Sequence, residues 1–183
     1  LRAYSLRLAA AVAGVWRQGK FPLVLGGDCS NIIGIMLALR RAGRYGLVFI
    51  DGHADFYQPE AEPTGEVASM DLAVVSGRGP AVLTDIDGLR PLVRDEDIVA
   101  FGFRDAAQQR EYRSQDIRET AIHAFELDEV RERGARVAAE QAVGILLRDE
   151  VEGFWIHLDA DVLDDAVMPA VDYRLPGGLS WDE

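Results

Sequence analysis

Two short stretches of the sequence combine acidic and imidazole side chains in a pattern that suits metal chemistry. Asp51-Gly52-His53-Ala54-Asp55 follows one apolar run, and Asp159-Ala160-Asp161 follows another. In an extended chain alternate side chains point to the same face, so each motif should present its ligands together. Ionised carboxylates this close repel each other unless a cation compensates them. The two motifs therefore predict a pair of divalent cations roughly 3.5–4 Å apart. The alternative for the first motif is a polar turn after its strand, with Asp51 capping a neighbouring helix.

A third stretch, Gly26-Gly27-Asp28-Cys29-Ser30, follows a further apolar run and opens a helical pattern. Two glycines permit a tight turn and a close approach of the backbone, and Asp28 or Ser30 can cap the helix. A phosphate cradle is conceivable, but the turn lacks the lysine of a P-loop and the spacing of a dinucleotide fingerprint. Cys29 at a helix start could be a thiolate nucleophile with His53 as its base, or simply a small buried residue.

The two other histidines receive less weight. His157 shares the strand alternation of Asp159 and Asp161 and could lie near them, but we expect a hydrogen-bonded residue below the site. Nothing around His123 suggests ligation, so a structural role is expected there.

Around these motifs the chain is predicted to alternate between strands and helices. Apolar runs predict five buried parallel strands: Pro22–Leu25, Gly46–Ile50, Asp97–Phe101, Ala121–Phe125 and Gly153–Leu158. Apolar residues at helical spacing predict helices over Leu1–Gln18, Ser30–Arg41, Glu66–Val75, Asp105–Arg118 and Asp128–Leu147. This alternation favours right-handed crossovers and a mainly parallel, doubly wound α/β sheet, whose ligands bind beyond the carboxyl ends of the strands. The acidic motifs stand at that edge, in what we predict to be a single domain over residues 1–183.

The composition limits the partners that this chain could have. Lys+Arg is 19 and Asp+Glu is 31, so the net charge is 19 − 31 = −12; such a chain repels phosphates, and no nucleic-acid partner is expected. No apolar run approaches the roughly 20 residues of a membrane helix, so no membrane association is expected. The single cysteine, Cys29, excludes an internal disulfide and fits a reduced, cytoplasmic setting. The chain begins at Leu1 and stops after the turn-like Pro176-Gly177-Gly178, so we expect structure to be missing at both ends.

In this order the three motifs resemble those of the ureohydrolase family, which comprises arginase, agmatinase, formimidoylglutamase and their relatives. The family pattern is Gly-Gly-Asp-His-Ser, then Asp-Ala-His-x-Asp, then Asp-x-Asp-x-x-Asp-Pro. The resemblance runs from Gly26 to Glu183, and three further landmarks support it: Pro63-Thr64-Gly65, Phe101-Gly102-Phe103-Arg104, and Pro176-Gly177-Gly178-Leu179-Ser180 with Glu183.

The resemblance implies a three-layer α/β/α domain that binds two manganese ions. Asp51 and Asp159 would bridge the two metals, and His53 with Asp161 would complete one of them. Asp55 would serve the other metal. One histidine ligand of the family pattern is Cys29 here, and a softer thiolate favours zinc or iron over manganese. The implied ligand set is therefore Asp51, His53, Asp55, Asp159, Asp161 and Cys29.

The resemblance also implies a reaction. A hydroxide held between the metals would attack the central carbon of a guanidinium or formimino group in a small-molecule substrate. Asp55 would pass a proton to the leaving amine, and Asp51 and His53 would complete the catalytic set. Relatives often form trimers or hexamers, so a homo-oligomer is expected.

Three departures from the family pattern bear on activity. Cys29 replaces the ligating histidine, Ala68-Ser69-Met70-Asp71 stands where the family commonly has His-Gly-x-Pro, and Asp165 replaces a proline. The first two, at Cys29 and Ala68, motivate one alternative, a family member with lost or altered catalysis that acts as a binding or regulatory subunit. A second alternative is a deacetylase-like enzyme with a single zinc.

Overall fold

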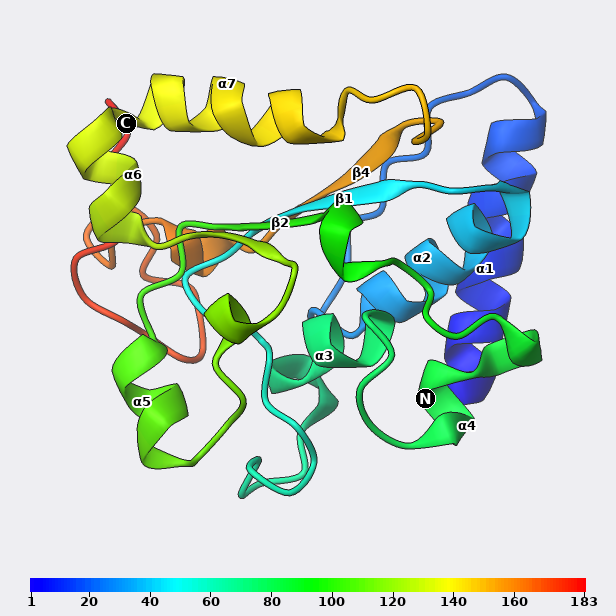
Figure 1. Ribbon diagram of the computed structural model, residues 1–183, viewed down its shortest axis with the longest axis horizontal. Coiled ribbons are helices and arrows are strands. Elements are labelled where there is room, and N and C mark those ends of the chain that lie inside the picture. The colour runs from blue at the N-terminus through cyan, green and yellow to red at the C-terminus, as the bar shows by residue number, and fades with distance from the viewer.

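A four-stranded parallel sheet forms the centre of the computed structural model, which describes residues 1–183 (Figure 1). Its strands are β1 (Gly46–Ile50), β2 (Ile98–Phe101), β3 (His123–Phe125) and β4 (Phe154–Leu158). The order across the sheet is β3-β2-β1-β4, and all neighbouring strands run parallel. Because Ile50 of β1 is in register with Leu158 of β4, the residues that follow these two strands emerge side by side.

Seven α-helices and several short 3-10 turns connect the strands. The helices are α1 (Arg2–Arg17), α2 (Asn31–Ala42), α3 (Asp71–Val75), α4 (Ala81–Thr84), α5 (Ala106–Glu111), α6 (Leu127–Arg133) and α7 (Ala135–Leu146). The 3-10 turns are η1 (Val67–Ser69), η2 (Ile86–Gly88), η3 (Asp95–Asp97), η4 (Ile117–Glu119) and η5 (Ala160–Val162). None of the helices combines the length and the apolar character needed to cross a membrane.

The sheet separates two hydrophobic cores because alternate strand residues point to opposite faces. On one face Leu47 and Phe49 of β1 pack with α1, α2 and α3, and on the other Val48 packs with α6 and α7. Figure 1 shows α7 on one side of the sheet and α1, α2 and α3 on the other. The prediction of a three-layer α/β/α fold with a parallel, doubly wound sheet is confirmed.

The first predicted strand is wrong. Pro22–Leu25 forms no ladder with the sheet, and the side chains of Phe21, Leu23 and Leu25 are exposed. An apolar run becomes a strand only where a neighbour satisfies its backbone groups, and no strand of this sheet pairs with the segment. The outer edge of β4 is likewise unpaired and exposes Ile156 and Leu158.

The helix predictions at the N-terminus are accurate to about one residue, whereas the later ones are too long. The pattern over Asp128–Leu147 is divided into α6 and α7 at Gly134, whose φ of 84° lies outside the helical range. The patterns over Glu66–Val75 and Asp105–Arg118 produce only α3 and α5 with short 3-10 turns. Both segments run close to the carboxyl ends of the strands, where the acidic motifs lie, and tertiary contacts there override helical periodicity.

Candidate metal centre

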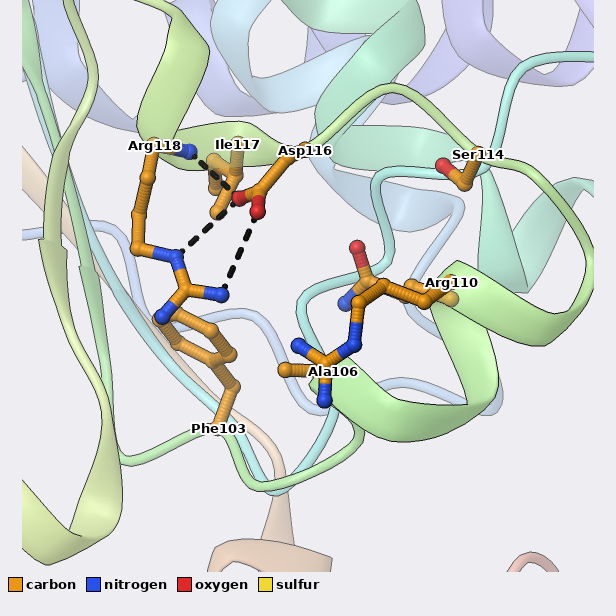
Figure 2. A pocket seen from close by; sticks show the side chains of 8 residues that line it. Phe103, Ala106, Arg110, Ser114, Asp116, Ile117 and Arg118 are labelled. Atoms are coloured by element: carbon orange, nitrogen blue, oxygen red, sulfur yellow. Dashed lines mark hydrogen bonds and ion pairs between the residues drawn. The ribbon is translucent and has the colours of Figure 1, made fainter.

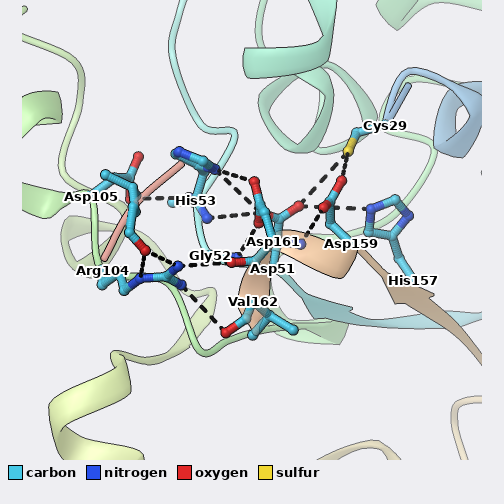
Figure 3. A network of polar contacts seen from close by, with 12 residues as sticks. Cys29, Asp51, Gly52, His53, Arg104, Asp105, His157, Asp159, Asp161 and Val162 are labelled. Atoms are coloured by element: carbon cyan, nitrogen blue, oxygen red, sulfur yellow. Dashed lines mark hydrogen bonds and ion pairs between the residues drawn. The ribbon is translucent and has the colours of Figure 1, made fainter. Parts of the chain in front are cut away.

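The two acidic motifs meet at the carboxyl ends of β1 and β4. The backbone N–H of Asp51 donates to Phe101 O at 3.1 Å, and the N–H of Asp159 donates to Ile50 O at 2.9 Å. The sheet ladder therefore continues into both motifs and holds their side chains at one edge. Figure 3 shows Asp51, Asp159 and Asp161 converging from these two strand ends.

One group of potential ligands comprises Asp51, His53 and Asp161, whose ligating atoms all lie within 4.8 Å of one another. His53 Nδ1 lies 2.8 Å from Asp161 Oδ2. The N–H of Gly52 donates to Asp161 Oδ1 at 2.9 Å, and the N–H of His53 donates to Asp51 Oδ1 at 2.7 Å. Two carboxylates and one imidazole thus face a common point.

A second group surrounds the sulfur of Cys29. Cys29 Sγ lies 2.9 Å from Asp159 Oδ2 and 3.9 Å from Asp51 Oδ2. The sulfur and one carboxylate oxygen each from Asp55 and Asp71 lie within 4.8 Å of one another. The sulfur, a carboxylate oxygen of Asp51 and a ring nitrogen of His157 form another such group. Both side-chain hydrogen bonds of Cys29 are to carboxylates, and neither is to His53. The structure therefore does not show the Cys29–His53 pair that a cysteine nucleophile with a histidine base would need.

The first motif does not keep the simple alternation that its spacing predicts. Asp55 has a φ of 45°, in the left-handed region, so the chain turns after His53. This turn sends Asp55 towards Cys29, while His53 stays with Asp161. The six side chains predicted as ligands are brought together, but they divide between two neighbouring positions that Asp51 connects.

Burial and hydrogen bonding perturb the first group strongly. Burial raises the pKa of Asp51 to about 8, although its hydrogen bond with His53 opposes the rise. Burial by itself lowers the pKa of His53, but hydrogen bonds to Asp161 and Asp51 outweigh it and raise the pKa to about 10. Burial by itself would raise the pKa of Asp161. The hydrogen bond with His53 and the charge of that ring outweigh burial and lower the pKa of Asp161 below its usual value. The charge of His53 is therefore balanced mainly by Asp161, which it contacts at 2.8 Å.

The second group has no such compensation. Burial, followed by the charge of nearby carboxylates, raises the pKa values of Cys29, Asp55 and Asp71 well above their ordinary ranges. The ion pairs of the whole cluster involve histidine alone, and no lysine or arginine pairs with its carboxylates. Clustered buried carboxylates of this kind are normally paired or bound to a metal. Oxygen, imidazole and thiolate donors suit divalent transition metals, so the residues present fit a pair of cations.

Three neighbouring residues fix the loops of this centre. A Cβ added to Gly52 would lie 2.5 Å from Arg104 Nη1 and 2.6 Å from the carbonyl oxygen of Asp161, so only glycine allows the two loops to approach. Arg104 Nη2 donates to that same carbonyl at 2.8 Å. Asp105 Oδ1 accepts from the N–H of Ala54 at 3.1 Å and so holds the turn between His53 and Asp55.

Sequence reasoning missed two carboxylates of this region. Asp71 was noted only as part of a departure from the family pattern, yet it lies in the Cys29 group. Asp105 follows β2 by four residues, so the rule that ligands gather beyond strand ends could have drawn attention to it. No signal of comparable strength exists for Asp71, which starts α3 rather than following a strand.

The expectation for His157 is wrong in one respect. Its ring is stacked on Phe49 with centroids 4.4 Å apart, and buried Nε2 has no hydrogen-bond partner. Burial lowers the pKa of His157 to about 4. It therefore lies beside Asp51, at 3.9 Å from Oδ2, as a neutral ring and not as a hydrogen-bonded support. His123 lies in β3, paired in register with Val99, and belongs to none of the ligand groups.

A separate hollow near α5 is not part of this centre (Figure 2). Asp116 and Arg118 pair with each other at its wall, with Arg118 Nε 3.1 Å from Asp116 Oδ1. Because these two charges satisfy each other, the hollow offers no free carboxylate to a cation. Its lining residues are Phe103, Ala106, Gln109, Arg110, Ser114, Asp116, Ile117 and Arg118.

The fold and the centre together define a doubly wound α/β domain whose strands end in a cluster of acidic side chains that fits divalent cations. A model of the Arginase family matches residues 2–183, and the chain belongs to that family. It is 35% identical over 179 residues to the arginase of Bacillus caldovelox, covering 97% of this chain and 58% of that protein. It is 30% identical to the arginase of Staphylococcus aureus (strain COL), covering 97% of this chain and 57% of that protein.

A solved structure of the Bacillus caldovelox arginase is similar with a TM-score of 0.88 at 33% identity, covering 99% of this chain and 60% of that chain. The resemblance to the ureohydrolases is thereby confirmed. The chain spans a little under three fifths of the length of these relatives.

Proposed function

We propose that this chain carries the metal-binding core of a hydrolase that cleaves a C–N bond in a guanidino or related amidine substrate. The observation that carries the proposal is the pair of ligand groups that meet at Asp51: Asp51 with His53 and Asp161 on one side, and with Cys29 on the other. Relatives at 30–35% identity bear the name arginase, which supports a guanidino compound as the substrate class.

Each ligand has a distinct role in this proposal. Asp51 and Asp159, which both approach the Cys29 sulfur and stand at the ends of adjacent strands, would be the carboxylates shared by the two cations. His53 and Asp161 would complete the ligand set of one cation. Asp55 and Cys29 would serve the other. Manganese suits the oxygen and nitrogen ligands, whereas the thiolate of Cys29 shifts preference towards zinc or iron.

When bound, two divalent cations supply Lewis acidity and lower the pKa of water, so that a nucleophile is available near neutral pH. The residues of the chain orient the metal-binding side chains and transfer a proton. Asp161 and Asp51 orient the His53 ring through their contacts with it. Asp55, which accepts no side-chain hydrogen bond from the protein, is free to carry a proton towards the leaving amine.

The two alternatives are less well supported. The family match favours neither a deacetylase-like enzyme nor a subunit without catalysis. A cytoplasmic location and a homo-oligomeric state stay predictions, the first from the single cysteine and the second from the resemblance.

Metal analysis followed by a substrate screen tests the proposal. The purified protein should hold two divalent cations per chain, and after metal loading it should release urea, or the analogous amide, from one of arginine, agmatine, guanidinobutyrate and formimidoylglutamate. Two cations without turnover of any of these compounds would overturn the substrate class. A protein that takes up no stoichiometric metal would overturn the whole proposal.

A further inference from the structure

One buried carboxylate beside Cys29 has no partner within the protein. Asp71 is completely inaccessible to solvent, and neither of its carboxylate oxygens has a hydrogen-bond partner. Asp97 is equally inaccessible, but its carboxylate pairs with Arg44 at 2.7 Å and with Arg148. Burying a carboxylate without a hydrogen bond or counter-charge is costly. The contrast between these two aspartates indicates that Asp71 is placed to receive something from outside the chain.

The position of Asp71 is fixed by the same turn that carries Asp55. Asp71 is the first residue of α3, and the N–H of the next residue, Leu72, donates to the carbonyl oxygen of Asp55 at 3.1 Å. The left-handed conformation of Asp55 directs this carbonyl towards α3. As a result, one carboxylate oxygen each from Asp55 and Asp71 lies within 4.8 Å of the other and of the Cys29 sulfur.

Two departures from the family pattern therefore meet in space. Cys29 stands where the family has a ligating histidine, and Asp71 stands where the family pattern His-Gly-x-Pro ends in proline. One position has lost an imidazole ligand, and the other has gained a carboxylate that faces the same sulfur. A chance polar substitution at a fully buried position would be selected against by its desolvation cost, whereas a ligand at that position would be compensated by the cation.

We propose that Asp71 is a further metal ligand, which holds the cation on the Cys29 side together with Cys29 and Asp55. This inference rests on the proposed function, because it requires that the centre bind metal. It makes the two metal positions chemically unlike. The position of His53 and Asp161 offers nitrogen and oxygen, and the position of Cys29 offers one sulfur and the oxygens of Asp55 and Asp71.

The donor set of the Cys29 position indicates the class of cation. With Asp51 and Asp159, whose carboxylate oxygens lie 3.9 Å and 2.9 Å from the sulfur, five protein donors are available, of which one is a thiolate and four are carboxylates. A thiolate among them favours zinc, cobalt or ferrous iron over manganese. Coordination also supplies the positive charge that deprotonates a thiol, so Cys29 can bind as the thiolate.

Cobalt(II) titration of the whole protein tests this inference, because thiolate coordination to cobalt gives a charge-transfer absorption that reports the Cys29 position. Asp71→Asn keeps the shape of the side chain and removes its charge. It should weaken cobalt binding at the sulfur-bearing position by at least about tenfold, since even residues that only orient ligands commonly contribute 10- to 100-fold. Binding at the His53 position should be much less affected. It is measured from the total cobalt bound per chain after the sulfur-bearing position is accounted for.

Asp97→Asn is the matched control, because it also replaces a completely buried aspartate but lies among arginines. It should lower thermal stability and leave both cobalt affinities unchanged. Asp71→Pro, which restores the family residue, provides a second variant in case the asparagine variant does not fold, and it should weaken cobalt binding in the same way.

The outcomes separate this inference from the proposed function. If the wild-type protein binds two cobalt ions and both Asp71 variants bind them with unchanged affinity, Asp71 is not a ligand and the proposed function stands. If the wild-type protein binds no cobalt, both fail together. A tenfold loss in the Asp71 variants together with the sulfur absorption in the wild type supports the inference, whereas cobalt binding without that absorption would overturn it, because Cys29 would then not share the cation with Asp71.

Discussion

Cys29 Sγ lies 2.9 Å from Asp159 Oδ2, which joins the loop before α2 to the end of β4 across 130 residues of sequence. This contact brings the glycine-rich motif against the second acidic motif. Asp51, from the first acidic motif, lies 3.9 Å from the same sulfur, so carboxylates of both acidic motifs face Cys29.

Asp159→Ala should abolish metal binding at both positions, because its carboxylate is proposed to bridge them. The expected result is a fall from two cations to none per chain, with loss of hydrolysis, measured by metal analysis after dialysis. Asp149→Ala, at an exposed site on the surface, should keep full metal content. A variant that retains two cations would show that Asp159 does not bridge.

Cys29→His should raise manganese affinity, because an imidazole is a better ligand for this metal than a thiolate. The gain should be about tenfold or more, measured by titration of manganese against the wild type. Cys29→Ser serves as the control, since it removes the sulfur without adding a nitrogen, and its affinity should not rise. Unchanged manganese affinity in the histidine variant would place residue 29 outside the ligand set.

Metal binding should release protons and strengthen as the pH rises. Asp51, with a pKa of about 8, and His53, with a pKa of about 10, both hold a proton at neutral pH and must lose it to coordinate a cation. Apparent affinity should therefore increase from about pH 6 to about pH 8. Calorimetric titrations in buffers of different ionisation enthalpy measure the protons released. An affinity that is flat or falls over this interval would contradict the raised pKa values.

Gly52→Ala should disrupt the centre through its backbone, because the added methyl would collide with Arg104 and with the carbonyl oxygen of Asp161. We expect a loss of about 1–3 kcal/mol in unfolding free energy, together with weaker metal binding. Gly144→Ala is the matched control, since a Cβ there meets nothing within 4 Å and alanine is the better helix former. Denaturant unfolding compares the two variants, and an unaffected Gly52→Ala would mean that the loops can separate.

Local pattern was sufficient to find most of the elements that carry the centre. The apolar runs before Asp51 and Asp159 could be identified as β1 and β4 because strands buried on both faces are nearly continuous in apolar residues. The helices α1 and α2 were predictable from their 3.6-residue periodicity. The run at Pro22–Leu25 has the same apolar character but forms no strand, because pairing depends on a neighbour that local sequence does not specify.

The order of residues along the chain was enough to show which side chains follow the strands, and hence that carboxylates, an imidazole and a thiol were available for cations. Their division into two groups follows from the folded chain, in which Asp55 turns towards Cys29 and His53 stays beside Asp161. The fold alone brought Asp71 and His157 to the same sulfur. The physical reason is that spacing along a chain fixes the direction of neighbouring side chains, whereas the meeting of distant ones depends on how whole elements pack across the sheet.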